Sequence, residues 1–238
     1  MKKGLFVLAS LLVMSSFASA GLTGNTVVFN DIGQDVGDYF GTAAVTGDTI
    51  TFNPSIFAVG TGEPDNFLNK QLWFTIDAKP GSDIDSLEIE EFGDFTLFGN
   101  GTDLTTYVSV QAVGTIRIDD VEGVALPQPI FVQGNMDFKK SNLVWDDGTF
   151  GLVTDGPGSD GWEGELKFDI DQILSDNLIA GKATSVYFTM DNILFATAAN
   201  GDVAQIEKKA VGGFVLTVPE PATMALLGLG GLLLRRKK

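Results

Sequence analysis

Short runs in which apolar and polar residues alternate recur along the middle of this chain, and they constrain its fold more than any other feature. The clearest run is residues 166–170, where every second residue is apolar and the residues between them are charged. A period of two places one face of a strand against a core and the other against water. Clusters of Gly, Asn and Asp separate the runs, which favours an antiparallel β-sandwich or barrel.

We expect ten or more strands and predict an all-β fold, an antiparallel β-sandwich of jelly-roll-like type. Asn200-Gly201 separates two of the runs, and this dipeptide is the preferred centre of a type I′ hairpin, so we predict that the two flanking strands pair. One short helix is expected over residues 171–180, with Gly181 suited to end it. Besides residues 166–170, the predicted strands are residues 26–30, 49–53, 71–77, 87–90, 95–98, 107–119, 130–138, 185–198, 202–208 and 214–218.

The N-terminal 20 residues have the three parts of a secretory signal peptide. Met1-Lys2-Lys3 is the charged start, residues 5–13 are the apolar centre, and Ala18-Ser19-Ala20 offers small residues for cleavage. We expect the secretion machinery and a signal peptidase to act here and the mature chain to begin at Gly21. A permanent membrane helix over residues 4–17 is the alternative, which the short apolar length disfavours.

The C-terminal segment, residues 218–238, combines a Pro-Glu-Pro step, an apolar run and a basic end. Pro219 and Pro221 keep the backbone around Glu220 extended. The uncharged residues 222–234 span only about 20 Å as a helix, against about 30 Å of hydrocarbon, so we predict a short, marginal transmembrane anchor. The basic end should stay in the cytoplasm and leave the body outside; it consists of Arg235, Arg236, Lys237 and Lys238. A buried helix of a soluble domain is the alternative, but it would show an amphipathic stripe.

The order of these three parts resembles the PEP-CTERM sorting signal of bacterial exported proteins. The resemblance implies a precursor anchored in the inner membrane and an exosortase-type enzyme that recognises Pro219, Glu220 and Pro221 and cuts the tail. It also implies delivery to the cell surface or extracellular matrix. The chain then divides into a signal peptide (residues 1–20), a sandwich body (residues 21–217) and a sorting tail (residues 218–238).

Charge and composition narrow the function of the body. Without the two terminal signals it has nine basic and 30 acidic side chains, a net charge of −21, which excludes nucleic acid and anionic membranes as partners. The chain has no Cys and no His, which excludes disulfides, Ser-His-Asp triads, Cys-His pairs and ordinary zinc sites. We expect no enzyme, and only a glycosidase built from two carboxylates remains open. The candidate acids on loops are Asp146, Asp147, Asp155, Asp160 and Glu163.

Two binding activities stay open for the body. Residues 187–194 resemble the closing strands of other PEP-CTERM proteins with sandwich bodies and the last strand of jelly-roll carbohydrate-binding modules. The second resemblance implies that Asp191 holds a structural calcium ion, which abundant Asp and Asn oxygens also favour. Trp145 and Trp162 lie in an Asp- and Gly-rich stretch and either stack on a sugar or plug the rim of the core.

These observations leave three functions open. The first is a structural surface or matrix protein, the second a carbohydrate-binding module on extracellular polysaccharide, and the third a calcium-dependent glycosidase.

Overall fold

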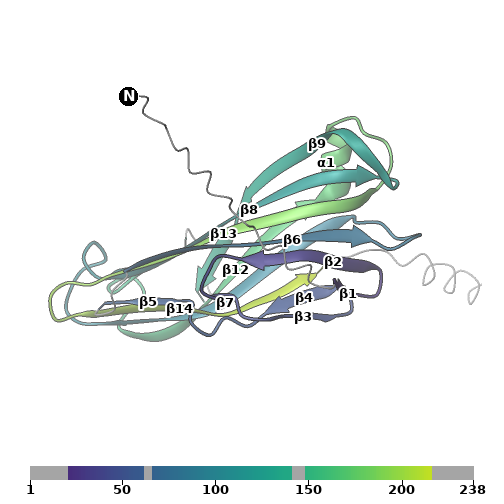
Figure 1. Cartoon of the computed structure of the whole chain (residues 1–238). Helices are drawn as coiled ribbons and strands as arrows, with labels where there is room; N and C mark the ends of the chain where they lie inside the picture. The colour runs from purple at the N-terminus through teal and green to yellow at the C-terminus, as the bar shows by residue number, and fades with distance from the viewer. Residues whose placement is uncertain (1–20, 62–65, 141–147, 216–238) are drawn as a thin grey trace, which may run out of the picture.

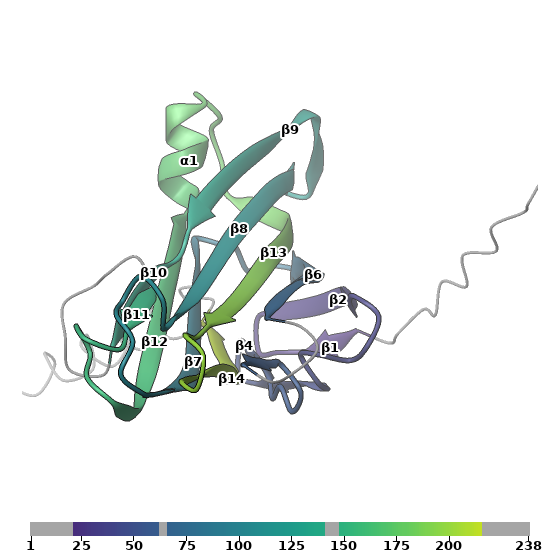
Figure 2. The same cartoon turned by 90° about the vertical axis from the view of Figure 1, so that its left-hand side faces the viewer.

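Fourteen strands, all paired antiparallel, form two sheets in the part of the chain that the structure describes, namely residues 21–61, 66–140 and 148–215 of a computed structural model. The sheets stack as two layers (Figures 1 and 2). The predicted all-β antiparallel sandwich is therefore confirmed. The signal peptide, the whole sorting tail and Trp145 lie outside the described residues.

The first sheet, sheet A, has the order β1-β2-β6-β13-β8-β11, with β9 also paired to β8. Its central strand, β13, pairs along its length with β6 on one side and β8 on the other. The strands are β1 (Leu22–Thr23), β2 (Val27–Gln34), β6 (Phe67–Ala78), β8 (Tyr107–Val121), β9 (Val124–Asn135), β11 (Thr149–Gly151) and β13 (Ala183–Thr197).

The second sheet, sheet B, has the order β10-β12-β7-β14-β4-β3, with β5 also paired to β14. Its central pair is β7 and β14, and β12 lies on the other side of β7. The strands are β3 (Ala43–Thr46), β4 (Thr49–Phe52), β5 (Ala58–Gly60), β7 (Ser86–Phe98), β10 (Asp137–Lys140), β12 (Gly158–Asp169) and β14 (Val203–Val215).

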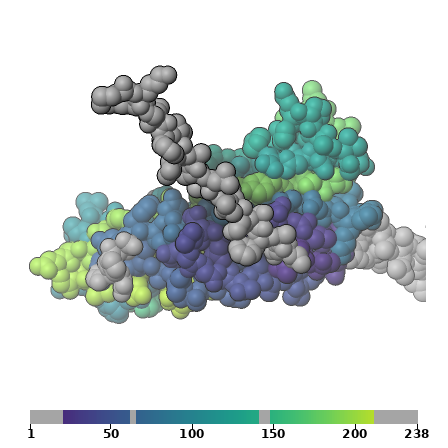
Figure 3. Space-filling view, in the orientation of Figure 1, coloured from purple at the N-terminus to yellow at the C-terminus, as the bar shows by residue number. Residues whose placement is uncertain are grey.

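The core lies between the two sheets, because alternate residues of each long strand point inward. Aromatic pairs join the layers: Phe95 of β7 stacks on Phe150 of β11 with ring centroids 4.5 Å apart, and Phe52 of β4 lies 6.5 Å from Phe74 of β6. In the space-filling view the end of the body formed by β8 and β9 rises above the remaining strands (Figure 3). None of the helices among the described residues has the length and apolar character needed to cross a membrane.

The predicted helix is present but shorter than expected, and it lies at the same end as the β8–β9 turn (Figures 1 and 2). α1 runs over Ile170–Asp176, and the Asp169 side chain caps it by accepting a hydrogen bond of 3.0 Å from the Gln172 backbone N–H. The chain leaves the helix before Gly181 because Leu178 already takes a left-handed conformation, with φ of 58°. Gly181 is therefore not the residue that ends the helix.

The predicted pairing of the strands that flank Asn200-Gly201 is wrong, because β13 belongs to sheet A and β14 to sheet B. Both edges of β13 are already occupied, by β6 and β8, so no edge is left for β14. The turn has a hydrogen bond of 2.9 Å from Asp202 N–H to the Ala199 carbonyl. Gly201 has φ of 89°, but Asn200 does not have positive φ, which fits a type II turn and not the type I′ turn of a hairpin.

A type I′ hairpin does exist, between β8 and β9 of sheet A. Glu122 and Gly123 both have positive φ, 52° and 72°, and Val121 pairs with Val124 across the two-residue turn between β8 and β9. The turn conformation that we predicted for Asn200-Gly201 is thus adopted by Glu122-Gly123.

Candidate functional site

Three polar side chains lie in the interior between the sheets, and we call them the interior polar cluster: Glu91, Asn192 and Lys208. They sit on the central strands β7, β13 and β14, at positions whose neighbours two residues away are mostly apolar and buried. The alternation of each strand therefore directs these side chains into the core. Glu91 and Asn192 are 0% exposed and Lys208 is 2% exposed.

Lys208 connects the other two members of the cluster. Its Nζ forms an ion pair with Glu91 Oε2 and donates a hydrogen bond to Asn192 Oδ1. Glu91 and Lys208 belong to sheet B, whereas Asn192 belongs to sheet A. The lysine amine thus bridges the two layers at the centre of the sandwich.

Aromatic rings surround the lysine amine. Lys208 Nζ lies 5.2 Å from the ring centroid of Phe57 and 5.8 Å from that of Trp162, and each of these two side chains is 1% exposed. The Lys208 backbone N–H donates to the Phe57 carbonyl at 2.9 Å. These rings separate the cluster from solvent.

Gly93 makes room for this arrangement. It lies opposite Lys208 on one side and opposite Trp162 on the other. A Cβ at residue 93 would lie 2.3 Å from the Trp162 ring and 2.1 Å from the Glu207 carbonyl oxygen. Only glycine lets the indole lie across β7 beside the lysine.

Burial favours the uncharged forms of Glu91 and Lys208. Loss of water raises the pKa of Glu91 and lowers the pKa of Lys208, and the attraction between the two charges opposes both shifts without reversing them. The direction of both shifts favours a neutral amine beside a neutral carboxylic acid.

The cluster is also incompletely hydrogen-bonded. Within the described part of the chain, no group hydrogen-bonds to Glu91 Oε1, Asn192 Nδ2 or Trp162 Nε1. Buried polar atoms without partners and buried ion pairs both cost folding free energy. A cluster of this kind at the centre of a core is a candidate for chemistry, because perturbed groups concentrate at functional sites.

Of the two tryptophans that either stack on a sugar or plug the rim of the core, Trp162 is inside the core and Trp145 lies outside the described residues. At 1% exposure the Trp162 ring presents no face to a ligand, and it packs edge-on against Phe138 with centroids 5.8 Å apart. Of the two roles left open for Trp162, stacking on a sugar is therefore wrong, and burial in the core describes its position.

The calcium candidate, Asp191, points away from the core, because it neighbours the inward-facing Asn192 on β13. It is half-buried, and its Oδ1 accepts a hydrogen bond of 3.0 Å from Gln71 Nε2. Within residues 21–61, 66–140 and 148–215, no three acidic side chains gather closely enough to hold a metal ion.

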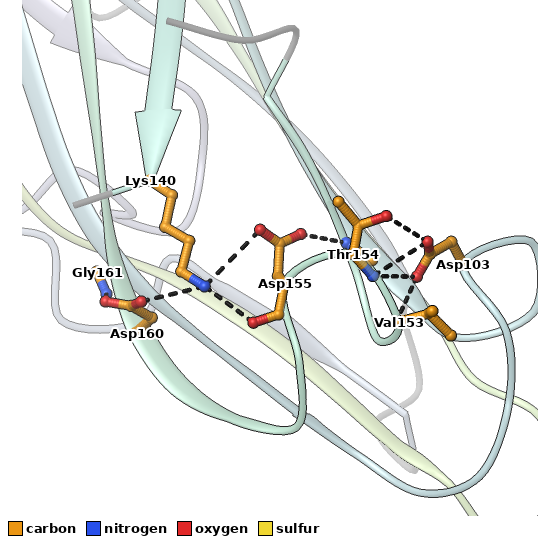
Figure 4. A network of polar contacts seen from close by, with 8 residues as sticks. Asp103, Lys140, Val153, Thr154, Asp155, Asp160 and Gly161 are labelled. Carbon is orange, nitrogen blue, oxygen red and sulfur yellow. Dashed lines mark hydrogen bonds and ion pairs between the residues drawn. The ribbon is translucent and has the colours of Figure 1, made fainter. Parts of the chain in front are cut away.

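Two of the candidate acids, Asp155 and Asp160, take part in a polar network around Lys140 (Figure 4). Asp160 and Glu163 lie on β12 and not on a loop as predicted. Lys140 Nζ lies 3.3 Å from Asp160 and 3.8 Å from Asp155, and it donates to the Asp155 carbonyl at 3.0 Å. Asp155 also accepts from the Gly151 N–H at 2.7 Å. Glu163 lies outside this network, 2.9 Å from Lys139. These acids hold β10, β11 and β12 together, and Asp146 and Asp147 lie outside the described residues.

Comparison with known families adds one finding, at the C-terminus. A model of the PEP-CTERM protein-sorting motif matches residues 217–238. The chain carries a PEP-CTERM sorting motif. This confirms the resemblance, and it identifies an exported protein that is sorted by exosortase-type machinery.

The PEP-CTERM motif covers the tail alone. No curated protein matches the sequence. Among solved structures, the family 11 xylanase from Neocallimastix patriciarum is 9% identical, with a TM-score of 0.23 over 83% of this chain and 97% of that chain. A loop-swap mutant of Neocallimastix patriciarum Xyn11A is 10% identical, with a TM-score of 0.22 over 81% of this chain and 94% of that chain. Likenesses this low carry no argument about activity.

Sequence reasoning missed the interior polar cluster, although the alternation contained a sign of it. On β13 the inward positions are Val186, Phe188, Met190, Asn192 and Leu194, so Asn192 interrupts an apolar series. Lys208 follows Ala204 and Ile206 in the same way on β14. A polar residue at a strand position where the alternation predicts an apolar, inward-facing residue is the signal that indicates such a cluster.

Proposed function

We propose that this PEP-CTERM protein is a non-enzymatic structural protein of the cell surface or extracellular matrix. The observation that carries the proposal is the PEP-CTERM match over residues 217–238, joined to an acidic β-sandwich. The described candidate acids support a structural role, because Asp155, Asp160 and Glu163 are all held in ion pairs within the fold.

The route to the surface follows from the two terminal segments. Secretion through the N-terminal signal would thread the body outward until the apolar run and the basic end stop it. A 13-residue apolar run holds weakly, which suits a temporary anchor. An exosortase-type enzyme then cuts near the Pro219-Glu220-Pro221 step and releases the body to the surface.

The test compares two triple-alanine variants in the producing cells. Changing Pro219, Glu220 and Pro221 to Ala should leave an uncut precursor in the membrane. Changing Pro127, Gln128 and Pro129 to Ala is the matched control, since these residues are exposed on β9, and this variant should be processed normally.

Mass spectrometry of the surface fraction then gives the result. The normal protein and the control should end before residue 225 and lack residues 225–238. An intact tail in that fraction, or normal processing of the Pro-Glu-Pro variant, would contradict the proposed route.

A second experiment tests the alternative function, binding to extracellular polysaccharide. With Trp162 inside the core, no described tryptophan remains for the predicted stacking on a sugar. We expect no binding when the exported protein is applied to a glycan array. Reproducible binding to one class of glycan would replace the structural role with that of a carbohydrate-binding module.

A further inference from the structure

We propose that Lys208 and Asn192 join in an intramolecular isopeptide bond, formed by the protein itself with Glu91 as the catalytic acid and base. The bond would link Nζ of Lys208 to Cγ of Asn192 and so connect β14 of sheet B to β13 of sheet A. Three observations carry this proposal: the contact between the reacting groups, the position of Glu91, and the exclusion of water.

The reacting groups already touch. Lys208 Nζ donates to Asn192 Oδ1, so the amine nitrogen lies against the carboxamide whose carbon it would attack. Both groups are held on central strands of rigid sheets, and neither has to travel. Fixing a nucleophile against its target in this way removes most of the entropic cost of the reaction.

The reaction balances without any further reactant. The lone pair of the neutral Nζ forms a new C–N bond at Cγ, and the bond from Cγ to Nδ2 breaks. The proton lost by Nζ and a proton delivered to Nδ2 pass through Glu91, and ammonia leaves. One amide replaces another, nothing is oxidised or reduced, and Glu91 returns to its starting form.

Glu91 is placed for this proton transfer, since its Oε2 contacts Lys208 Nζ and its carboxyl group has no other partner among the described residues. Burial raises the pKa of Glu91 and lowers the pKa of Lys208, and both shifts are in the direction of a protonated acid and a neutral amine. Desolvated lysines act as nucleophiles for this reason. The rings of Phe57 and Trp162 exclude the water that would compete for the carbonyl carbon.

The product also accounts for the Asn192 and Glu91 atoms that lack partners. Asn192 Nδ2, which has no hydrogen-bond acceptor in the described structure, departs as ammonia. The buried amine becomes a neutral amide N–H, and Glu91 can accept its hydrogen bond. A chain without cysteine would thereby gain a covalent link between its two sheets.

Peptide mapping of the natively purified full chain tests the proposal directly. Residues 183–207 contain no Lys or Arg, so trypsin normally releases the peptide of residues 183–208, with Asn192 and Lys208 inside it. Linked Lys208 is no longer a trypsin site, and the peptide should extend to Lys209. It should lack about 17 Da, the ammonia released when the lysine amine displaces the amide nitrogen. Fragment ions from within residues 192–208 should be absent, because one backbone cleavage does not open the ring.

Two variants sharpen the result. Asn200 precedes Gly201 and could itself lose ammonia, so Asn200→Ala is the control, and it should retain the mass loss and the resistance of Lys208 to trypsin. Glu91→Gln should restore the unlinked mass and cleavage after Lys208. A linked peptide in Glu91→Gln would overturn the role of Glu91. Folded normal protein with an unmodified peptide of residues 183–208 would overturn the bond itself.

Discussion

Lys208 and Asn192 meet side chain to side chain in the core although their strands hydrogen-bond in different sheets. Only 16 residues separate them, and the intervening turn carries the chain from one sheet to the other. The two sheets are therefore in polar contact at their centres, in a core that is otherwise almost entirely apolar.

Replacing Lys208 with Met should destabilise the protein strongly. The change leaves the Glu91 carboxyl group buried without its partner, and a buried polar group left without a partner costs about 1–3 kcal/mol. The double variant Glu91→Leu/Lys208→Met should recover part of that loss, because the carboxyl group without a partner is no longer in the core. Urea unfolding measures both, and a double variant less stable than Lys208→Met would contradict this account of the cluster.

Gly201→Val should destabilise the turn through the backbone alone. Gly201 has φ of 89° and no atom within 4 Å of the position a Cβ would take, so the cost is conformational strain of about 1–3 kcal/mol. Gly201→Asn should cost less, since asparagine tolerates positive φ better. Thermal unfolding distinguishes the two variants, and equal losses would argue against backbone strain as the cause.

Asp202 should stabilise the protein at neutral pH and lose this effect in acid. Hydrogen bonds from the Thr106 hydroxyl and from the backbone N–H groups of Asn100 and Gly101 lower the pKa of Asp202 in the folded state. A carboxyl group whose pKa is lower in the folded state stabilises the fold at pH values above its unfolded pKa, which is near 4. This stabilisation is lost as the pH falls through the folded-state pKa. Asp202→Asn should therefore lower the Tm at pH 7 and have little effect near pH 2, and a constant difference would contradict the assignment.

Calcium should raise the Tm of the exported body. A net charge of −21 repels itself when the chain is compact, and an ion that binds only the folded form stabilises it by mass action. The comparison is between melting curves with millimolar calcium and with a chelator. Identical curves would show that calcium does not stabilise the folded body, and they would contradict the role of Asp191 as a calcium ligand.

Local patterns predicted the strands well and their partners poorly. Alternation located the strands at residues 71–77 and 107–119, because burial of one face shows in the sequence of each strand. Which strands pair depends on contacts distant in the chain: β13 is filled on both edges by β6 and β8, and no feature of Asn200-Gly201 reveals this.

The same limit applies to the cluster. Charged residues on strands are usually solvated, so the sequence alone does not distinguish Glu91 and Lys208 from surface residues. Only the fold brings them together with Asn192. The sorting tail was predictable because it is recognised by the order of adjacent segments in the sequence, and this order does not depend on the fold.

Electron density at the centre of the sandwich is the most direct test of the claim that this exported protein links its own sheets. In a high-resolution crystal structure of the purified protein, the account predicts continuous density from Lys208 Nζ to Asn192 Cγ at an amide bond length of about 1.33 Å. Separate side chains, with the amine about 2.9 Å from the carboxamide oxygen and an intact Nδ2, would contradict it.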